Sequence, residues 1–126
     1  MRVFKSKAVN RWAHSEGVAD AELCKAAAEV AAGKVEADLG GYLFKKRIAR
    51  HGGGKSGGYR TIIGFRKGNT DRILFLYAFP KNARANITVK EAEALSIAAS
   101  SFIDATDAQI AMLLEDGRIF ELECPP

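Results

Sequence analysis

Cationic side chains are the chemically distinctive feature of this 126-residue chain, and they gather in its middle. Residues 41–90 hold twelve Lys or Arg side chains and a single carboxylate, Asp71, which gives a net charge of +11. Residues 1–40 are balanced and residues 91–126 carry −7, so the overall charge of +4 hides a strongly polarised chain. A concentrated positive segment within a compact fold indicates a polyanionic partner, because its field attracts phosphate groups.

The residue types also limit the chemistry that the chain could perform. His14 and His51 have no Ser, Cys or Asp partner at a recognisable spacing, and the basic segment contains no pair of carboxylates. Nucleophilic triads, glycosidase-type acid pairs, metal centres and other cofactors are therefore not expected. An Arg can hold a phosphate and stabilise the charge that develops on its oxygens, and a Lys can exchange a proton. Phosphoryl transfer on RNA is the reaction class that suits such cations.

A glycine-rich stretch at residues 52–58 contains Gly54-Lys55-Ser56, which matches the end of the nucleotide-binding P-loop motif. The first glycine of that motif would be residue 49, which is alanine. A P-loop also requires a strand before it and a helix after it, whereas here a strand is expected to follow. The sequence therefore predicts a connection between two strands and no nucleotide site.

The basic segment is expected to form an antiparallel sheet. Strands are expected at residues 42–49, 59–66 and 72–79, with short connections that favour a meander. Because side chains alternate between the faces of a strand, Lys45 and Arg47 share one face, and Arg60 shares a face with Ile62. If helices cover the apolar face, the opposite face becomes a basic surface centred on Lys45, Arg47 and Arg60. The alternative is that these cations simply solvate an exposed sheet.

Two helices are expected after a short N-terminal strand at residues 2–5. Ser6 is the expected N-cap of the first helix, and Gly17 ends it. Asp20 is the expected N-cap of the second helix, which is rich in Ala and ends at Gly33. Small side chains allow close packing, so the pair is expected to form a helical hairpin.

Two further helices are expected after the meander. Thr88 with Glu91, and Thr106 with Gln109, have the spacing of capping boxes, in which side chains bond the free backbone groups of a helix start. Residues 118–123 are expected to add an edge strand. The sequence thus predicts a single α+β domain over residues 1–126, in which an N-terminal strand and helical hairpin pack on a small antiparallel sheet. The expected core spans residues 1–90, and residues 91–126 form an acidic helical extension.

Other sequence features bear on the setting of the protein. Its longest apolar runs are of strand length, far short of a membrane span, and the N-terminus lacks the apolar stretch of a secretory signal. Cys24 and Cys124 lie far apart without a CxxC or Cys/His cluster, so neither a disulfide framework nor a zinc site is expected. These features favour a reduced, cytoplasmic setting.

Three segments resemble the RelE/HigB-like toxins of type II toxin–antitoxin systems. They are Lys45-Lys46-Arg47-Ile48-Ala49-Arg50, Gly54-Lys55-Ser56-Gly57-Gly58-Tyr59-Arg60-Thr61-Ile62-Ile63 and Phe75-Leu76-Tyr77-Ala78-Phe79-Pro80-Lys81-Asn82-Ala83-Arg84-Ala85-Asn86-Ile87. With the N-terminal strand, the hairpin and the late helices, the resemblance covers nearly the whole chain. It implies a microbial ribonuclease-type fold, a cytoplasmic protein, and an antitoxin partner, by the family pattern a small helix-turn-helix protein.

The resemblance also implies an activity. Relatives like RelE enter the ribosomal A site and cut mRNA there, the ribose 2′-hydroxyl attacking the adjacent phosphate without a metal. By position, Arg60 matches the strand arginine that stabilises the transition state, and Lys45 and Arg47 match a basic pair of which one transfers a proton. The residues expected to contact RNA are Lys55, Lys81, Arg84, Arg50 and Tyr77.

Two positions depart from the family pattern. Asn82 stands where RelE has a second catalytic arginine, and Thr88 stands where it has a C-terminal catalytic tyrosine. Tyr77 and Tyr59 are the tyrosines that could take the second role. The superfamily also contains ParE-like gyrase inhibitors, so inhibition of gyrase is an alternative function, as is binding of nucleic acid without cutting it.

Overall fold

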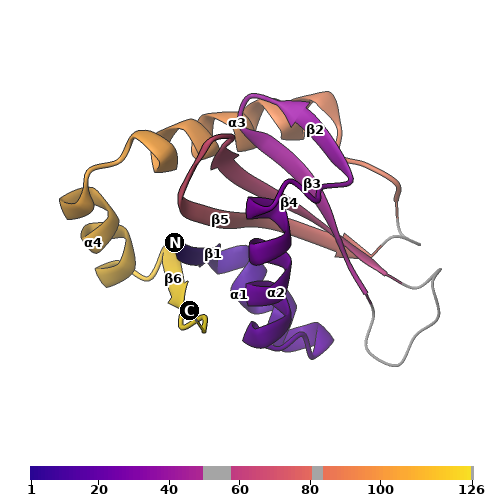
Figure 1. The fold of residues 1–126 in the computed structure, drawn as a ribbon, viewed down its shortest axis with the longest axis horizontal. Helices are drawn as coiled ribbons and strands as arrows, with labels where there is room; N and C mark the ends of the chain where they lie inside the picture. Colours follow the sequence, from indigo (N-terminus) through magenta and orange to yellow (C-terminus); the bar gives the residue numbers. More distant parts are fainter. Residues whose placement is uncertain (50–57, 81–83, 126) are drawn as a thin grey trace.

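The computed structural model describes residues 1–49, 58–80 and 84–125, and it has the predicted α+β class. A six-stranded mixed sheet of order β2-β3-β4-β5-β1-β6 carries helices on both of its faces (Figure 1). The elements in chain order are β1 (Arg2–Ser6), α1 (Lys7–Glu16), α2 (Asp20–Ala31), β2 (Ala37–Gly40), β3 (Leu43–Ile48), β4 (Tyr59–Arg66), β5 (Asn69–Pro80), α3 (Val89–Asp104), α4 (Asp107–Glu115) and β6 (Ile119–Leu122). In the described part of the chain, no helix has the length and apolar character needed to cross a membrane.

Three of the four expected helix starts are confirmed. Ser6 accepts a hydrogen bond from the Val9 amide, and both capping boxes are present at the starts of α3 and α4. The expectation for α2 is wrong by one residue, because Ala19 is the N-cap and makes no side-chain cap bond. Asp20 instead begins the helix, and its carboxylate accepts from Lys5 Nζ at 2.9 Å.

The meander of β3, β4 and β5 is confirmed, whereas two features of the sheet were not predicted. β1 pairs in parallel with β5 and antiparallel with the edge strand β6, so the sheet is mixed. β2 forms a hairpin with β3, and both residues of the connecting turn, Gly41 and Tyr42, have positive φ angles of 59° and 65°. A two-residue hairpin turn of type I′ requires such angles.

Both faces of the sheet are apolar, and each is covered by its own helices. The side with α1 and α2 holds Phe44, Tyr59 and Phe75, while the side with α3 and α4 holds Phe4 and Ile62. A Cβ atom on Gly64 of β4 would lie 3.0 Å from the Cβ atom of Ala99, so α3 packs very close to the sheet. The expectation that the whole face opposite the hairpin is basic is therefore wrong, because α3 and α4 cover much of it.

Cys24 in α2 and Cys124 after β6 form a disulfide bond, with their Cα atoms 5.5 Å apart. The expectation of no disulfide is wrong because the contact exists only in the folded chain. β6 joins the sheet beside β1. Cys124, which follows β6, then packs against the apolar cluster beneath α1 and α2, to which Cys24 belongs. Nothing in the separation of 100 residues reveals that proximity.

Replacing Cys124 by Ser should lower the free energy of unfolding by about 2–4 kcal/mol, because the disulfide then no longer closes a long loop that restricts the unfolded chain. Urea denaturation of the variant and of the parent protein measures this difference. Reduction should bring the parent to the stability of the variant. Two reactive thiols in the unreduced, denatured protein would show that the bond does not form.

Candidate nucleic-acid interface

β3 and β4 bring the three expected catalytic residues onto one face of the sheet. Arg47 and Arg60 are direct cross-strand partners, and Lys45 pairs with Ile62, two residues further along β4. Ile62 belongs to the apolar cluster beneath α3 and α4, so the three cations share that face with it. The prediction from strand alternation is confirmed for this group.

Arg60 is nevertheless buried, with only 6% of its surface exposed. Its side chain reaches across β3 to Glu36, the residue before β2, where Nε lies 2.6 Å from Oε2. Its Nη1 atom is buried and has no hydrogen-bond partner among the described residues. The expectation that Arg60 lies on an open surface is wrong, because alternation assigns a face without showing what covers it. Glu36 was not identified from the sequence, where no spacing or motif links it to Arg60.

A cavity of about 380 Å³ adjoins this ion pair. The described residues that line it are Lys34, Val35, Glu36, Lys46, Arg47 and Arg60, so among them four cations accompany one carboxylate. Arg47 is exposed, and its side chain runs so close to Gly58 that a Cβ atom there would lie 2.9 Å from Nε. Lys46 pairs with Glu29 of α2 at 3.4 Å. The surplus of positive charge makes this cavity suitable for an anion.

Arg84 and Tyr77 form a second group on the same face. The Arg84 guanidinium donates to both carboxylate oxygens of Glu91, at 2.8 and 2.6 Å, and to the Tyr77 hydroxyl at 2.8 Å. It also lies over the rings of Tyr77 and Phe79. Phe79 is the cross-strand partner of Arg60, so the two groups adjoin. Arg84 is therefore tied to the start of α3.

The two tyrosines considered for a catalytic role lie on opposite sides of the sheet. Tyr59 is buried among the residues beneath α1 and α2, with its ring 5.0 Å from that of Trp12. Tyr77 pairs with Ile62 and so lies on the Arg60 face. Thr88, at the position of the family tyrosine, is the N-cap of α3. Arg50, Lys55, Lys81 and Asn82, and the glycine stretch at 52–57, lie outside the described residues.

The contacts of Arg84 control the ionisation of Glu91. Its hydrogen bonds to the carboxylate, with a further bond from the Thr88 amide, lower the pKa of Glu91 from 4.5 to about 2. The same pairing raises the pKa of Arg84 above its ordinary value. Both groups are thus charged throughout the physiological range.

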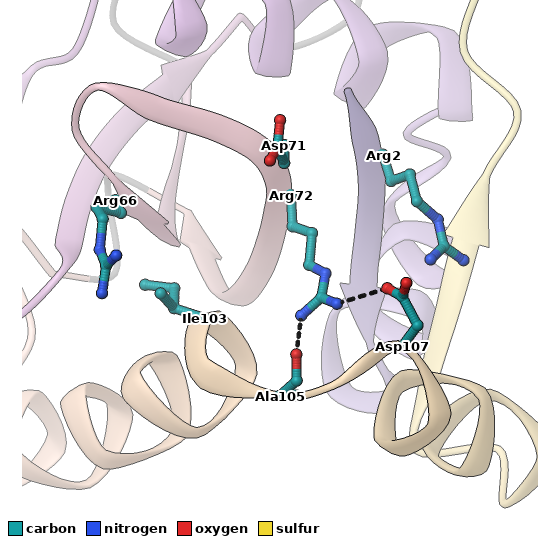
Figure 2. Close-up of a pocket in the computed structure, with 7 residues that line it drawn as sticks. All are labelled: Arg2, Arg66, Asp71, Arg72, Ile103, Ala105 and Asp107. Atoms are coloured by element: carbon teal, nitrogen blue, oxygen red, sulfur yellow. Dashed lines mark hydrogen bonds and ion pairs between the residues drawn. The ribbon is translucent and has the colours of Figure 1, made fainter.

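A second cavity, of about 300 Å³, holds three arginines at the other end of the sheet, and it has a structural role. Figure 2 shows Arg72 extending from β5 to the connection between α3 and α4, whereas Arg2 and Arg66 stand apart from it. Arg72 donates to Phe102 O, to Ala105 O and to the Asp107 carboxylate, at 3.2, 2.6 and 2.9 Å. Arg2 and Arg66 pair with other carboxylates, those of Glu121 and Asp104. The three guanidinium groups do not converge on a common ligand.

Within residues 1–49, 58–80 and 84–125, no three His, Cys, Asp or Glu side chains lie together in a way that could hold a metal ion. The described residues instead offer a cavity lined mainly by cations, which suits an anionic ligand. The α+β fold, with its N-terminal strand and helical pair, agrees with the resemblance stated above.

A comparison with models of protein families identifies the family of this chain. Residues 1–122 match the family model described as the RelE toxin of the RelE / RelB toxin-antitoxin system. The chain therefore belongs to the RelE toxin family, and its partner is an antitoxin. None of the curated proteins searched matches it.

Acid titration should reveal the Arg84–Glu91 pair. Because the folded pKa of Glu91, about 2, lies below the ordinary value of 4.5, the pair stabilises the fold fully above pH 4.5. This contribution is lost as the pH falls through about 2. An NMR titration of the Glu91 carboxyl should show a midpoint near 2, which Arg84→Gln should return toward 4.5 and the distant Arg11→Ala should not change. A midpoint near 4.5 in the parent protein would contradict the pairing.

Arg72→Ala should lower the free energy of unfolding by about 1.5–3 kcal/mol, because it removes charged hydrogen bonds that join α3, α4 and β5. Asp107→Ala removes only the acidic partner, whose side chain is 92% exposed, and should cost less than about 1 kcal/mol. Chemical denaturation of both variants tests this order. Equal losses would show that the bonds to the backbone carbonyls contribute nothing.

Proposed function

We propose that this RelE-family toxin is a ribosome-dependent endoribonuclease that cleaves mRNA. The observation that carries the proposal is Arg60, a buried arginine with an unbonded Nη1 atom, beside a cavity lined by three further cations. Such a group, fixed before the substrate arrives, can stabilise charge on a phosphate as the transition state forms. The family match supports a toxin, and the match by position of Arg60, Lys45 and Arg47 supports RNA as its target.

The proposed reaction is a transfer within the RNA strand. The ribose 2′-hydroxyl loses its proton, its oxygen bonds to the adjacent phosphorus, and the bond from phosphorus to the 5′-oxygen breaks. The departing 5′-oxygen takes up a proton, so the products are a 2′,3′-cyclic phosphate and a 5′-hydroxyl end. Arg60 stabilises the negative charge on the phosphate oxygens, and Lys45 or Arg47 takes part in proton transfer.

The remaining cations serve to hold the RNA. Arg50, Lys55 and Lys81 are proposed to contact its backbone, with Tyr77 offering a ring on which a base can stack. Arg84, bound to Glu91 and Tyr77, keeps that ring in place. The antitoxin is proposed to be a helix-turn-helix protein whose acidic or helical segment covers the basic face in the cytoplasm.

Arg60→Ala should reduce the rate of mRNA cleavage about 100- to 1,000-fold, the usual effect of removing one group that stabilises transition-state charge. Programmed ribosomes with end-labelled mRNA measure the rate, and Arg60→Lys tests whether charge alone suffices. Arg11→Ala, an exposed arginine on α1, is the matched control and should cleave normally. Circular dichroism checks that each variant is folded.

Induced expression separates this function from its alternatives. Growth arrest with codon-phased cuts in translated mRNA is the expected result. Intact transcripts in arrested cells would refute cleavage, and double-strand DNA breaks with an SOS response would indicate gyrase inhibition instead. Nucleic-acid binding that falls steeply with salt, without growth arrest dependent on Arg60, would indicate a binding module.

A further inference from the structure

We infer that Glu36 is a positioning residue that holds the Arg60 guanidinium at the cavity, where it takes a phosphate group of the RNA. The inference rests on the proposed function for the source of that phosphate. Glu36 lies outside the three segments that resemble the family, and only the folded structure brings it to Arg60.

The contact between Glu36 and Arg60 has the geometry expected of a positioning residue. Oε2 of Glu36 lies 2.6 Å from Nε of Arg60, at the side of the guanidinium nearest its own chain. Nη1 makes no hydrogen bond within the part of the chain that the structure describes. Arg84 offers the contrast, because both of its terminal nitrogens donate to Glu91 and few donors are left for a ligand. Glu36 thus holds Arg60 through Nε and leaves Nη1 as a donor that we infer is used by the phosphate.

Burial explains why a carboxylate is needed at this position. Arg60 is 6% exposed, and an unpaired cation that deeply buried is costly. Glu36 offsets the charge, while its own side chain remains 34% exposed and in contact with water. The pairing therefore fixes Arg60 in one place before the substrate arrives, which is the condition for electrostatic catalysis.

The cavity supplies room and charge for the ligand. Glu36 and its neighbours Lys34 and Val35 line it, so the charged end of Arg60, which reaches Glu36, lies at its wall. A buried donor without a partner is costly, and such donors occur at catalytic sites and at sites that bind an ion or water. Arg47, the exposed cross-strand neighbour of Arg60, lines the same cavity and brings a second guanidinium group to its wall.

The test compares Glu36→Ala, which removes the support, with Glu36→Gln, whose amide oxygen can still accept from Nε. Glu29→Ala is the matched control, since it removes the same charge from a glutamate that pairs with Lys46 of β3 and is not among the described residues that line the cavity. On programmed ribosomes, Glu36→Ala should lower kcat about 10- to 100-fold with little change in KM. Glu36→Gln should remain within a few-fold of the parent, and Glu29→Ala should match the parent.

A second measurement needs no ribosome. In ¹H–¹⁵N spectra, the Arg60 Nε–H signal should exchange slowly in the parent and in Glu36→Gln, and rapidly in Glu36→Ala. Inorganic phosphate should shift the Arg60 side-chain signals of the parent saturably. No shift at Arg60, or slow exchange of Nε–H in Glu36→Ala, would overturn the inference whether or not the protein cleaves mRNA.

The kinetic outcomes are equally decisive. Cleavage by Glu36→Ala at the parent rate or faster would show that Glu36 does not assist Arg60. Equal losses in the Ala and Gln variants would assign the effect to charge rather than to position, and would also overturn the inference. A parent protein that cleaves no mRNA would refute the proposed function alone, because the spectra still report on Glu36 and Arg60.

Discussion

The sheet is apolar on both faces, and this constraint determines where charge can lie. One face is covered by α1 and α2, and the other by α3 and α4, so most of the sheet residues on both faces are buried. Lys45, which is half-buried, and Arg47, which is exposed, lie on β3 next to the short edge strand β2. The candidate site therefore lies at the partly exposed margin of a sheet face that is otherwise buried.

Arg60 shows what the same constraint does to a cation nearer the centre of the sheet. β4 lies between β3 and β5, and nearly all of its residues are buried. A charge at this position requires a partner. Glu36 supplies it from the far side of β3, because it directly precedes the four-residue edge strand β2. A fixed, partly satisfied guanidinium is therefore a consequence of placing an arginine in a central strand.

Local sequence signals predicted the elements well, because their causes are local. Ser6, Thr88 and Thr106 begin helices through bonds to residues three positions on, and alternation placed Lys45, Arg47 and Arg60 on one face. Three of the contacts that were missed join distant segments: the disulfide, the parallel pairing of β1 with β5, and the pair of Glu36 with Arg60. Each of these contacts depends on which elements become neighbours in the fold, and the residue types involved do not by themselves identify their partners.

The polarised charge of the chain has two causes rather than one. The acidic residues 91–126 include partners for cations of the basic segment: Glu91 binds Arg84, Asp104 lies near Arg66, and Asp107 binds Arg72. These pairs fasten α3 and α4 to the sheet, and the family match extends through β6. Part of the +11 therefore holds the fold together. Lys45 and Arg47 instead share a face of the sheet with Arg60, which is the face proposed to receive the phosphate backbone.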